Sequence, residues 1–147
     1  MGYRMEQQES TGEVGGQEPI SLRVPSSAEY VLLPRLVVSS VGETAGFDAT
    51  DIYDLKLAVT EAVTNVIRHA AVGSMLVEYR ALAGVVEVTV ADAGRGFDTR
   101  ELGREAGENG GFGLAVIRSL VDEMDLNSSE EGTTVRITRY AAGSEGS

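Results

Sequence analysis

The sequence predicts an α+β fold, a two-layer sandwich of one mostly antiparallel sheet and one layer of helices. Three observations support this class. Several runs alternate apolar and polar residues, as half-buried strands do. Two of these runs are separated only by Ala83-Gly84, which indicates a hairpin. The helical patterns are grouped early in the chain, with one late insertion, and the segments elsewhere indicate mostly antiparallel strands.

The first strand and first helix follow a long polar start. Ile20–Val24 alternates apolar and polar residues and Pro25 closes it, which predicts a strand. Four apolar residues with helical spacing then predict a helix with one buried face: Tyr30, Leu33, Val37 and Val41. Pro34 either kinks this helix or moves its true start. The residues that offer its cap and its end are Ser26 or Ser27 and Gly42 or Gly46.

The second helix carries the strongest periodic signal in the chain. It is expected over about residues 49–70, with Asp48 as its cap. Its apolar stripe consists of Leu55, Val59, Ala62, Val66 and Ala70. The hairpin strands follow at 75–81 and 85–91.

A glycine-rich stretch, residues 92–113, separates the hairpin from the last elements. It is too rich in glycine for a regular element, and long loops inside compact domains are usually functional. A third helix is expected over about 112–123, and two last strands near 125–128 and 133–138. Alternation along the final strand places Thr133 on the same face as Val135 and Ile137, towards the helices.

Composition excludes several kinds of site. The chain has no cysteine, which excludes disulfides and thiolate metal sites, and its single histidine, His69, excludes paired imidazoles. The only lysine, Lys56, follows no glycine loop, which excludes a G-x-x-x-x-G-K-[ST] phosphate loop. The 12 basic and 23 acidic residues give a net charge of −11, which repels a nucleic-acid backbone.

Patterning along the chain also suggests its organisation and location. Residues 1–17 and 141–147 are polar and lack periodicity, so we expect a disordered lead and a disordered tail around one ordered domain, 18–140. No apolar run approaches the ~18 residues of a membrane span, and the N-terminus lacks the layout of a secretory signal. We therefore expect a cytoplasmic protein that contacts neither membrane nor nucleic acid.

Two polar segments are candidates for chemistry. Glu61 and Asn65 are four residues apart and share the shoulder of the second helix's apolar stripe. A glutamate there can accept a proton from a hydroxyl, and an asparagine oxygen is a suitable magnesium ligand. Asp92 ends a strand, and Gly94 and Gly96 after it allow backbone to approach a flat ligand. Taken singly, these features also fit a solvated helix edge and an ordinary strand-to-loop turn.

The third candidate segment, Gly110-Gly111-Phe112-Gly113, opens a helix. Backbone N–H groups at a helix start suit a di- or triphosphate, and glycine permits its approach. Glycines before a helix also occur in dinucleotide fingerprints, but those belong to parallel sheets, and the context here is antiparallel.

The order of these segments is more specific than any one of them. They are Glu61-Ala62-Val63-Thr64-Asn65, Asp92-Ala93-Gly94-Arg95-Gly96, Gly111-Phe112-Gly113-Leu114 and Gly132-Thr133-Thr134-Val135. This order resembles the ATPase superfamily of gyrase and the sensor histidine kinases, which has the Bergerat ATP-binding fold. The short length, together with the Glu-Ala-Val-Thr-Asn and Gly-Thr-Thr-Val segments, resembles its bacterial anti-sigma factor serine kinases. The resemblance spans about residues 19–140.

The resemblance implies ATP as substrate and Mg²⁺ as cofactor. Glu61 would be the general base that activates a partner's serine, and Asn65 would hold the magnesium ion. Asp92 would read the adenine amino group, with Thr133 beside it. The residues implied around the nucleotide and its phosphates are Gly94, Gly96, Gly110, Gly111, Phe112, Gly113 and Leu114. His69, at the end of the first motif, is assigned a structural role.

One position departs from the family pattern. Some members carry an arginine at the place of Asn109, where it touches the terminal phosphate. The arginines that could contact the terminal phosphate in its place are Arg95, Arg100 and Arg104. This departure keeps a second hypothesis open, a nucleotide-gated binding module with weak or no kinase activity. A third is an α/β domain that binds no nucleotide.

The resemblance also implies protein partners and a regulatory role. These are an alternative sigma factor, which the protein would sequester, and an anti-anti-sigma antagonist of the STAS type, which it would phosphorylate on serine. Such proteins act in transcription regulation during stress and commonly form homodimers. Residues 30–41 are a candidate for the homodimer face.

Overall fold

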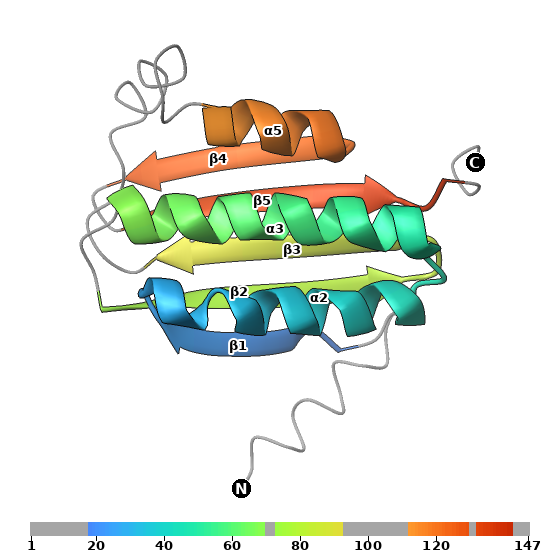
Figure 1. Ribbon diagram of the computed structural model, residues 1–147, viewed down its shortest axis with the longest axis horizontal. Coiled ribbons are helices and arrows are strands. Elements are labelled where there is room, and N and C mark those ends of the chain that lie inside the picture. The colour runs from blue at the N-terminus through green and yellow to red at the C-terminus, as the bar shows by residue number, and fades with distance from the viewer. Residues whose placement is uncertain (1–17, 70–72, 93–111, 130–131, 143–147) are drawn as a thin grey trace, which may run out of the picture.

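The computed structural model describes residues 18–69, 73–92, 112–129 and 132–142 (Figure 1). The expected lead, nearly all of the expected tail and most of the glycine-rich stretch lie outside these residues. The elements are β1 (Ile20–Pro25), the 3-10 helix η1 (Ala28–Tyr30), α2 (Leu32–Thr44), α3 (Ala49–His69), β2 (Ser74–Leu82), β3 (Val85–Asp92), α5 (Phe112–Leu120), β4 (Glu123–Ser129) and β5 (Gly132–Tyr140).

The strands form one antiparallel sheet in the order β1-β2-β3-β5-β4. Helices α2, α3 and α5 lie side by side over one of its faces (Figure 1). The hairpin between β2 and β3 turns at Gly84, whose φ of 79° lies in the region that favours glycine. The predicted α+β sandwich, with one sheet and one helix layer, is therefore confirmed.

The core lies between the sheet and α3. The predicted stripe of α3 is buried at Leu55, Val59, Ala62 and Val66. Opposite it are the helix-facing side chains of β2, β3 and β5, among them Val77, Val88, Val90, Val135 and Ile137. Each fully buried aliphatic side chain of this kind contributes about 1.5–3 kcal/mol. The predicted cap of α3 is also confirmed, because the Asp51 backbone N–H donates to Asp48 Oδ1 at 2.8 Å.

Helix α2 differs from its prediction in start and orientation. Its N-cap residue is Val31, with no side-chain cap bond, so the predicted serine cap is wrong for this helix. Pro34 occupies the third helical position, where its missing N–H leaves no bond unmade, so the proline moves the start rather than kinking the helix. The buried side is formed by Pro34, Val38, Val41 and Gly42, whereas Leu33 is 41% exposed.

The Pro34 carbonyl also anchors α2 to the sheet. It accepts a hydrogen bond from the Tyr79 hydroxyl of β2 at 3.1 Å, and burial raises the pKa of that tyrosine. This bond fixes the start of α2 over β2.

Helix α5 ends at Leu120, three residues before its predicted end at Glu123. The physical reason lies in β5. The backbone N–H of Asp122 donates to the Thr138 carbonyl at 2.9 Å, and the Asp122 carboxylate accepts from the Tyr140 N–H at 2.8 Å. These bonds attach Asp122 to β5, so the helix cannot continue past it. Strand β4 therefore starts at Glu123, two residues before its predicted start.

Candidate functional site

The strand register brings Asp92 and Thr133 together. They are directly opposed Cα partners at the end of β3 and the start of β5, and Asp92 is also opposed to Met75 of β2. Both face the helices, as predicted for Thr133, and are 3% and 0% exposed. The next rows of this face carry Val90 with Val135 and then Val88 with Ile137. A carboxylate and a hydroxyl thus form one polar row at the end of an otherwise apolar surface.

Asn65 is the second buried polar feature. It lies in the C-terminal half of α3 and is 2% exposed, yet neither Oδ1 nor Nδ2 has a hydrogen-bond partner among the described residues. Leaving a buried polar group unsatisfied costs about 1–3 kcal/mol. A group that the described protein does not supply, such as a metal ion or a polar ligand, would satisfy this amide.

These residues share one end of the fold. Figure 1 shows the C-terminal end of α3, the end of β3, the start of β5 and the start of α5 at its left side. Glu61 lies one turn before Asn65 on α3 and is partly exposed, so a second molecule can reach its carboxylate. Phe112 begins α5, and the first N–H groups of a helix, which have no partner within the helix itself, favour an anion. A carboxylate, an amide, a second carboxylate and a helix start therefore gather at this end.

Several predicted site residues lie outside the described residues. They are Gly94, Arg95, Gly96, Arg100, Arg104, Gly110 and Gly111. Phe112, Gly113 and Leu114 are the first three residues of α5, and the Leu114 side chain is partly buried. His69 is the last residue of α3.

Comparison with known proteins assigns the family. Residues 24–139 match the histidine kinase-like ATPase domain. The chain belongs to this family. It is 39% identical over 138 residues to the serine-protein kinase RsbW of Listeria innocua, covering 84% of this chain and 87% of that protein. It is 36% identical to RsbW of Bacillus thuringiensis, covering 84% and 85% respectively.

A solved structure has the same fold. The RsbU and RsbW domains of Rv1364c from Mycobacterium tuberculosis match with a TM-score of 0.64 at 24% identity, covering 84% of this chain and 32% of that one. The resemblance inferred from the four segments is confirmed, and with it the assignment of this chain as an ATP-dependent protein kinase of the histidine kinase-like ATPase family.

Asn65 fits the metal ligand of such an ATPase domain. Its buried amide oxygen is a hard donor without a described hydrogen-bond partner. Among the described residues, no group of three or more His, Asp or Glu side chains forms a metal site. This arrangement suits Mg²⁺, which usually takes one or two protein ligands and completes its shell with water and substrate phosphates.

Arg68 is a functional candidate of this ATPase domain that the sequence reasoning missed. It follows Asn65 by three residues, so it lies on the same side of α3, and it is exposed. The cations predicted to contact phosphate all lie in the glycine-rich stretch. The i, i+3 spacing from Asn65 was the signal that could have found it.

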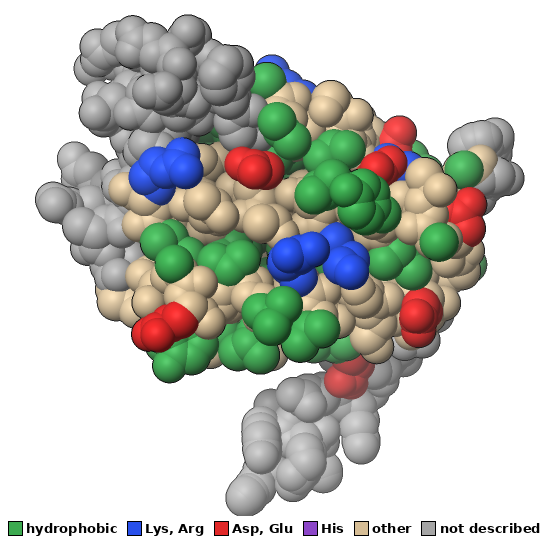
Figure 2. All heavy atoms as spheres, in the orientation of Figure 1, with side chains coloured by type: hydrophobic (Ala, Val, Ile, Leu, Met, Phe, Trp, Pro, Cys, Tyr) green, Lys and Arg blue, Asp and Glu red, His purple; other side chains and the backbone are tan. Residues whose placement is uncertain are grey.

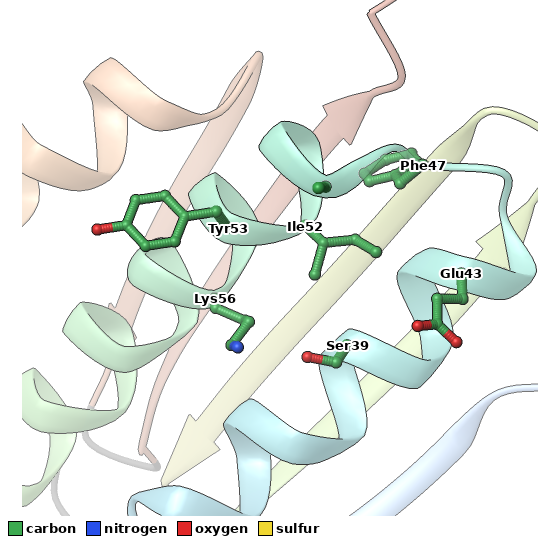
Figure 3. Close-up of a pocket in the computed structure, with 7 residues that line it drawn as sticks. Ser39, Glu43, Phe47, Ile52, Tyr53 and Lys56 are labelled. Atoms are coloured by element: carbon green, nitrogen blue, oxygen red, sulfur yellow. The ribbon is translucent and has the colours of Figure 1, made fainter.

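A separate hollow lies away from this end. About 500 Å³ in volume, it runs between α2 and the N-terminal half of α3 (Figure 3). Its lining consists of Ser39, Glu43, Phe47, Ala49, Ile52, Tyr53 and Lys56. Since Lys56 precedes Asn65 by nine residues, about 13 Å of helix separates the hollow from the candidate ATP site.

The described helices include none with the length and hydropathy needed to cross a bilayer.

Proposed function

We propose that this protein is a cytoplasmic, ATP-dependent serine kinase and anti-sigma factor. It sequesters an alternative sigma factor and phosphorylates a serine of an anti-anti-sigma antagonist of the STAS type. The observation that carries the proposal is the buried, unsatisfied amide of Asn65, at the same end of the fold as the Asp92–Thr133 row. The relatives named serine-protein kinase RsbW support it over most of the chain.

The polar row is assigned to the base of the nucleotide. The Asp92 carboxylate accepts a hydrogen bond from the adenine amino group, and the Thr133 hydroxyl is placed beside it by the strand register. Burial strengthens this recognition, because water competes poorly for a buried carboxylate.

The space between the C-terminal end of α3 and the start of α5 is assigned to the triphosphate. The Asn65 oxygen holds Mg²⁺, which neutralises phosphate charge in a chain that carries a net −11. The N–H groups at the start of α5 bind phosphate oxygens, and Arg68 supplies a cation from α3.

Glu61 is assigned as the general base. Its carboxylate accepts the proton of the antagonist's serine hydroxyl as the serine oxygen bonds to the γ-phosphorus. The bond from that phosphorus to the β–γ bridging oxygen breaks, and ADP leaves with the electron pair. A partly exposed position suits this role, because the substrate is another protein and must reach the carboxylate from outside.

Glu61→Gln tests the kinase assignment. The variant keeps the shape of the side chain and removes its basicity, so the rate of phosphoserine formation on the antagonist should fall by about 10²–10⁴-fold. Affinity for Mg-ATP should be unchanged. Glu43→Gln, an exposed carboxylate on α2, serves as the control and should transfer phosphate at the wild-type rate. Wild-type rates from Glu61→Gln would refute the role of this residue.

A second candidate function is a nucleotide-gated binding module. The observation that favours it is Asn109, which stands where some family members carry a phosphate-binding arginine. This candidate predicts that the wild-type protein binds Mg-ATP and a sigma factor but forms no phosphoserine on a true antagonist. Detection of phosphoserine in that mixture rejects it.

We also propose that the protein forms a homodimer through the exposed side of α2. Leu32, Leu33 and Leu36 are 57%, 41% and 56% exposed, and Ile20 of the neighbouring edge strand β1 is exposed as well. Figure 2 shows hydrophobic side chains gathered along this edge of the helical face. Sedimentation of Leu36→Glu should give a monomer with wild-type secondary structure. A wild-type protein that sediments as a monomer at all concentrations contradicts the proposal.

A further inference from the structure

One arginine joins three elements at the end of the fold opposite the candidate ATP site. Arg139, near the end of β5, points into the helix layer and its side chain is 17% exposed. Its Nη1 donates to the Leu120 carbonyl at 2.6 Å, at the last residue of α5. Its Nη2 donates to Asp51 Oδ1 at 2.7 Å and lies 3.2 Å from Asp54 Oδ2, both on the first turns of α3.

We call the contact of Arg139 with Leu120, Asp51 and Asp54 the joint. Its positive guanidinium is paired with the carboxylates of Asp51 and Asp54. Burial alone would raise the pKa of Asp51, but the hydrogen bond from Arg139, with support from the Ala142 N–H, holds it below its ordinary value of 3.8. The guanidinium also caps the C-terminal end of α5, where a cation is favourable. Arg139 thus forms a partly buried ionic contact with α3 and caps the C-terminal end of α5 with the same side chain.

The C-terminal end of α5 is fixed at further points. Asp122, two residues after the helix, bonds the Thr138 carbonyl through its N–H and the Tyr140 N–H through its carboxylate. Along its length α5 rests on α3 through Ile117, which is fully buried. The end near Leu120 is therefore tied both to β5 and to the start of α3.

This joint sets the register between α5 and α3. The two helices run in opposite directions (Figure 1), so the start of α5 lies towards the Asn65 end of α3. From Leu120 back to Phe112 is about 12 Å of helix, and from Asp54 to Glu61 is about 11 Å. Fixing Leu120 against Asp51 and Asp54 therefore holds the N–H groups at the start of α5 level with Glu61.

We propose that Arg139 is a positioning residue for the triphosphate. It never touches the nucleotide. By fixing the C-terminal end of α5 along α3, it holds the helix start level with Glu61, one turn before Asn65, where its N–H groups meet the phosphates. This inference rests on the proposed ATP site and adds a residue to it from the far end of the fold.

Affinities of Arg139→Gln for Mg-ATP and for adenosine, measured by competition against a fluorescent nucleotide, test the inference. Asp92 and Thr133 bind the base without α5, so affinity for adenosine should change by less than about twofold while affinity for Mg-ATP falls about tenfold. Arg139→Lys, whose ammonium lacks the two separate nitrogens that bind Leu120 and Asp51, should give an intermediate ratio and keeps the test valid if the glutamine variant unfolds.

Val38→Ala is the matched control. It opens a cavity in the core beneath α2 and lowers the melting temperature without touching the joint, so both affinities should stay at wild-type values. Equal losses of ATP and adenosine affinity in the Arg139 variants, or no loss in either, overturn the inference. A wild-type protein that binds no Mg-ATP fails the proposed function instead, so the two failures are distinguishable.

Discussion

Replacing Asn65 by leucine should stabilise the nucleotide-free protein and abolish binding of Mg-ATP. The asparagine is buried, and both polar atoms of its amide lack a hydrogen-bond partner among the described residues. Leucine has the same branching pattern without the polar atoms. The substitution therefore removes an unmet desolvation cost rather than a contact. Opposite changes in stability and in binding would mark a residue kept for its ligand.

The size of the effect follows from the burial of the amide. An unsatisfied buried polar group costs about 1–3 kcal/mol, and an apolar group of similar shape removes that cost. For a domain of this length the gain corresponds to a rise in melting temperature of about 3–10 °C. At a hundredfold excess over its Kd, Mg-ATP should stabilise the wild type by about 2.7 kcal/mol and the variant by nothing.

The assay is thermal unfolding with and without Mg-ATP, followed by circular dichroism. Asn127→Leu is the matched control, since Asn127 is exposed on β4 and its replacement should change stability by less than about 0.5 kcal/mol. A nucleotide-free Asn65→Leu that melts well below the wild type would show that the amide has partners inside the protein. Asn65 would then have no unmet hydrogen bond for a ligand to satisfy.

Three further predictions concern single side chains. Because the pKa of Asp51 is lower in the folded state, its ion pair stabilises the protein above pH 4 and is lost as pH falls through the folded-state pKa; Asp51→Asn should be less stable at pH 7 and should flatten the acid side of a urea-unfolding series. Arg68→Gln should weaken Mg-ATP binding more than ADP binding in calorimetry, with an unchanged melting temperature. Gly42→Ala places Cβ 2.9 Å from Cγ1 of Ile52 and should cost about 1 kcal/mol in urea unfolding, whereas Gly73→Ala meets no atom and should be neutral.

Much of the fold could be predicted because its signals are local. The capping aspartate and the apolar stripe of α3 lie within one segment, and the hairpin is specified by its alternating strands and Gly84. The orientation of Thr133 follows from strand alternation alone. For the candidate site, Glu61, Asn65, Asp92 and Thr133 could be proposed from sequence because their segments resemble a known family.

The predictions that were wrong or missing concern features that are set by contacts between residues far apart in the sequence. Helix α2 is apolar on more than one side, so its period does not select the buried face, and Leu33 points outward while Val38 enters the core. The end of α5 is decided by hydrogen bonds to β5. The joint of Arg139 with Asp51 connects residues 88 positions apart, and no local pattern announces it.

The strand register has a practical consequence for handling the protein. Pro25, at the end of β1, pairs with Ser74 near the row of Asp92, so β1 enters the sheet from the other side. Tyr140, at the end of β5, pairs with Val85 at the hairpin and also leaves away from that row. A fluorophore attached at residue 18 or residue 142, next to these strand ends, will therefore sit away from the Asp92–Thr133 row. Protein labelled at either position should retain its affinity for adenylates.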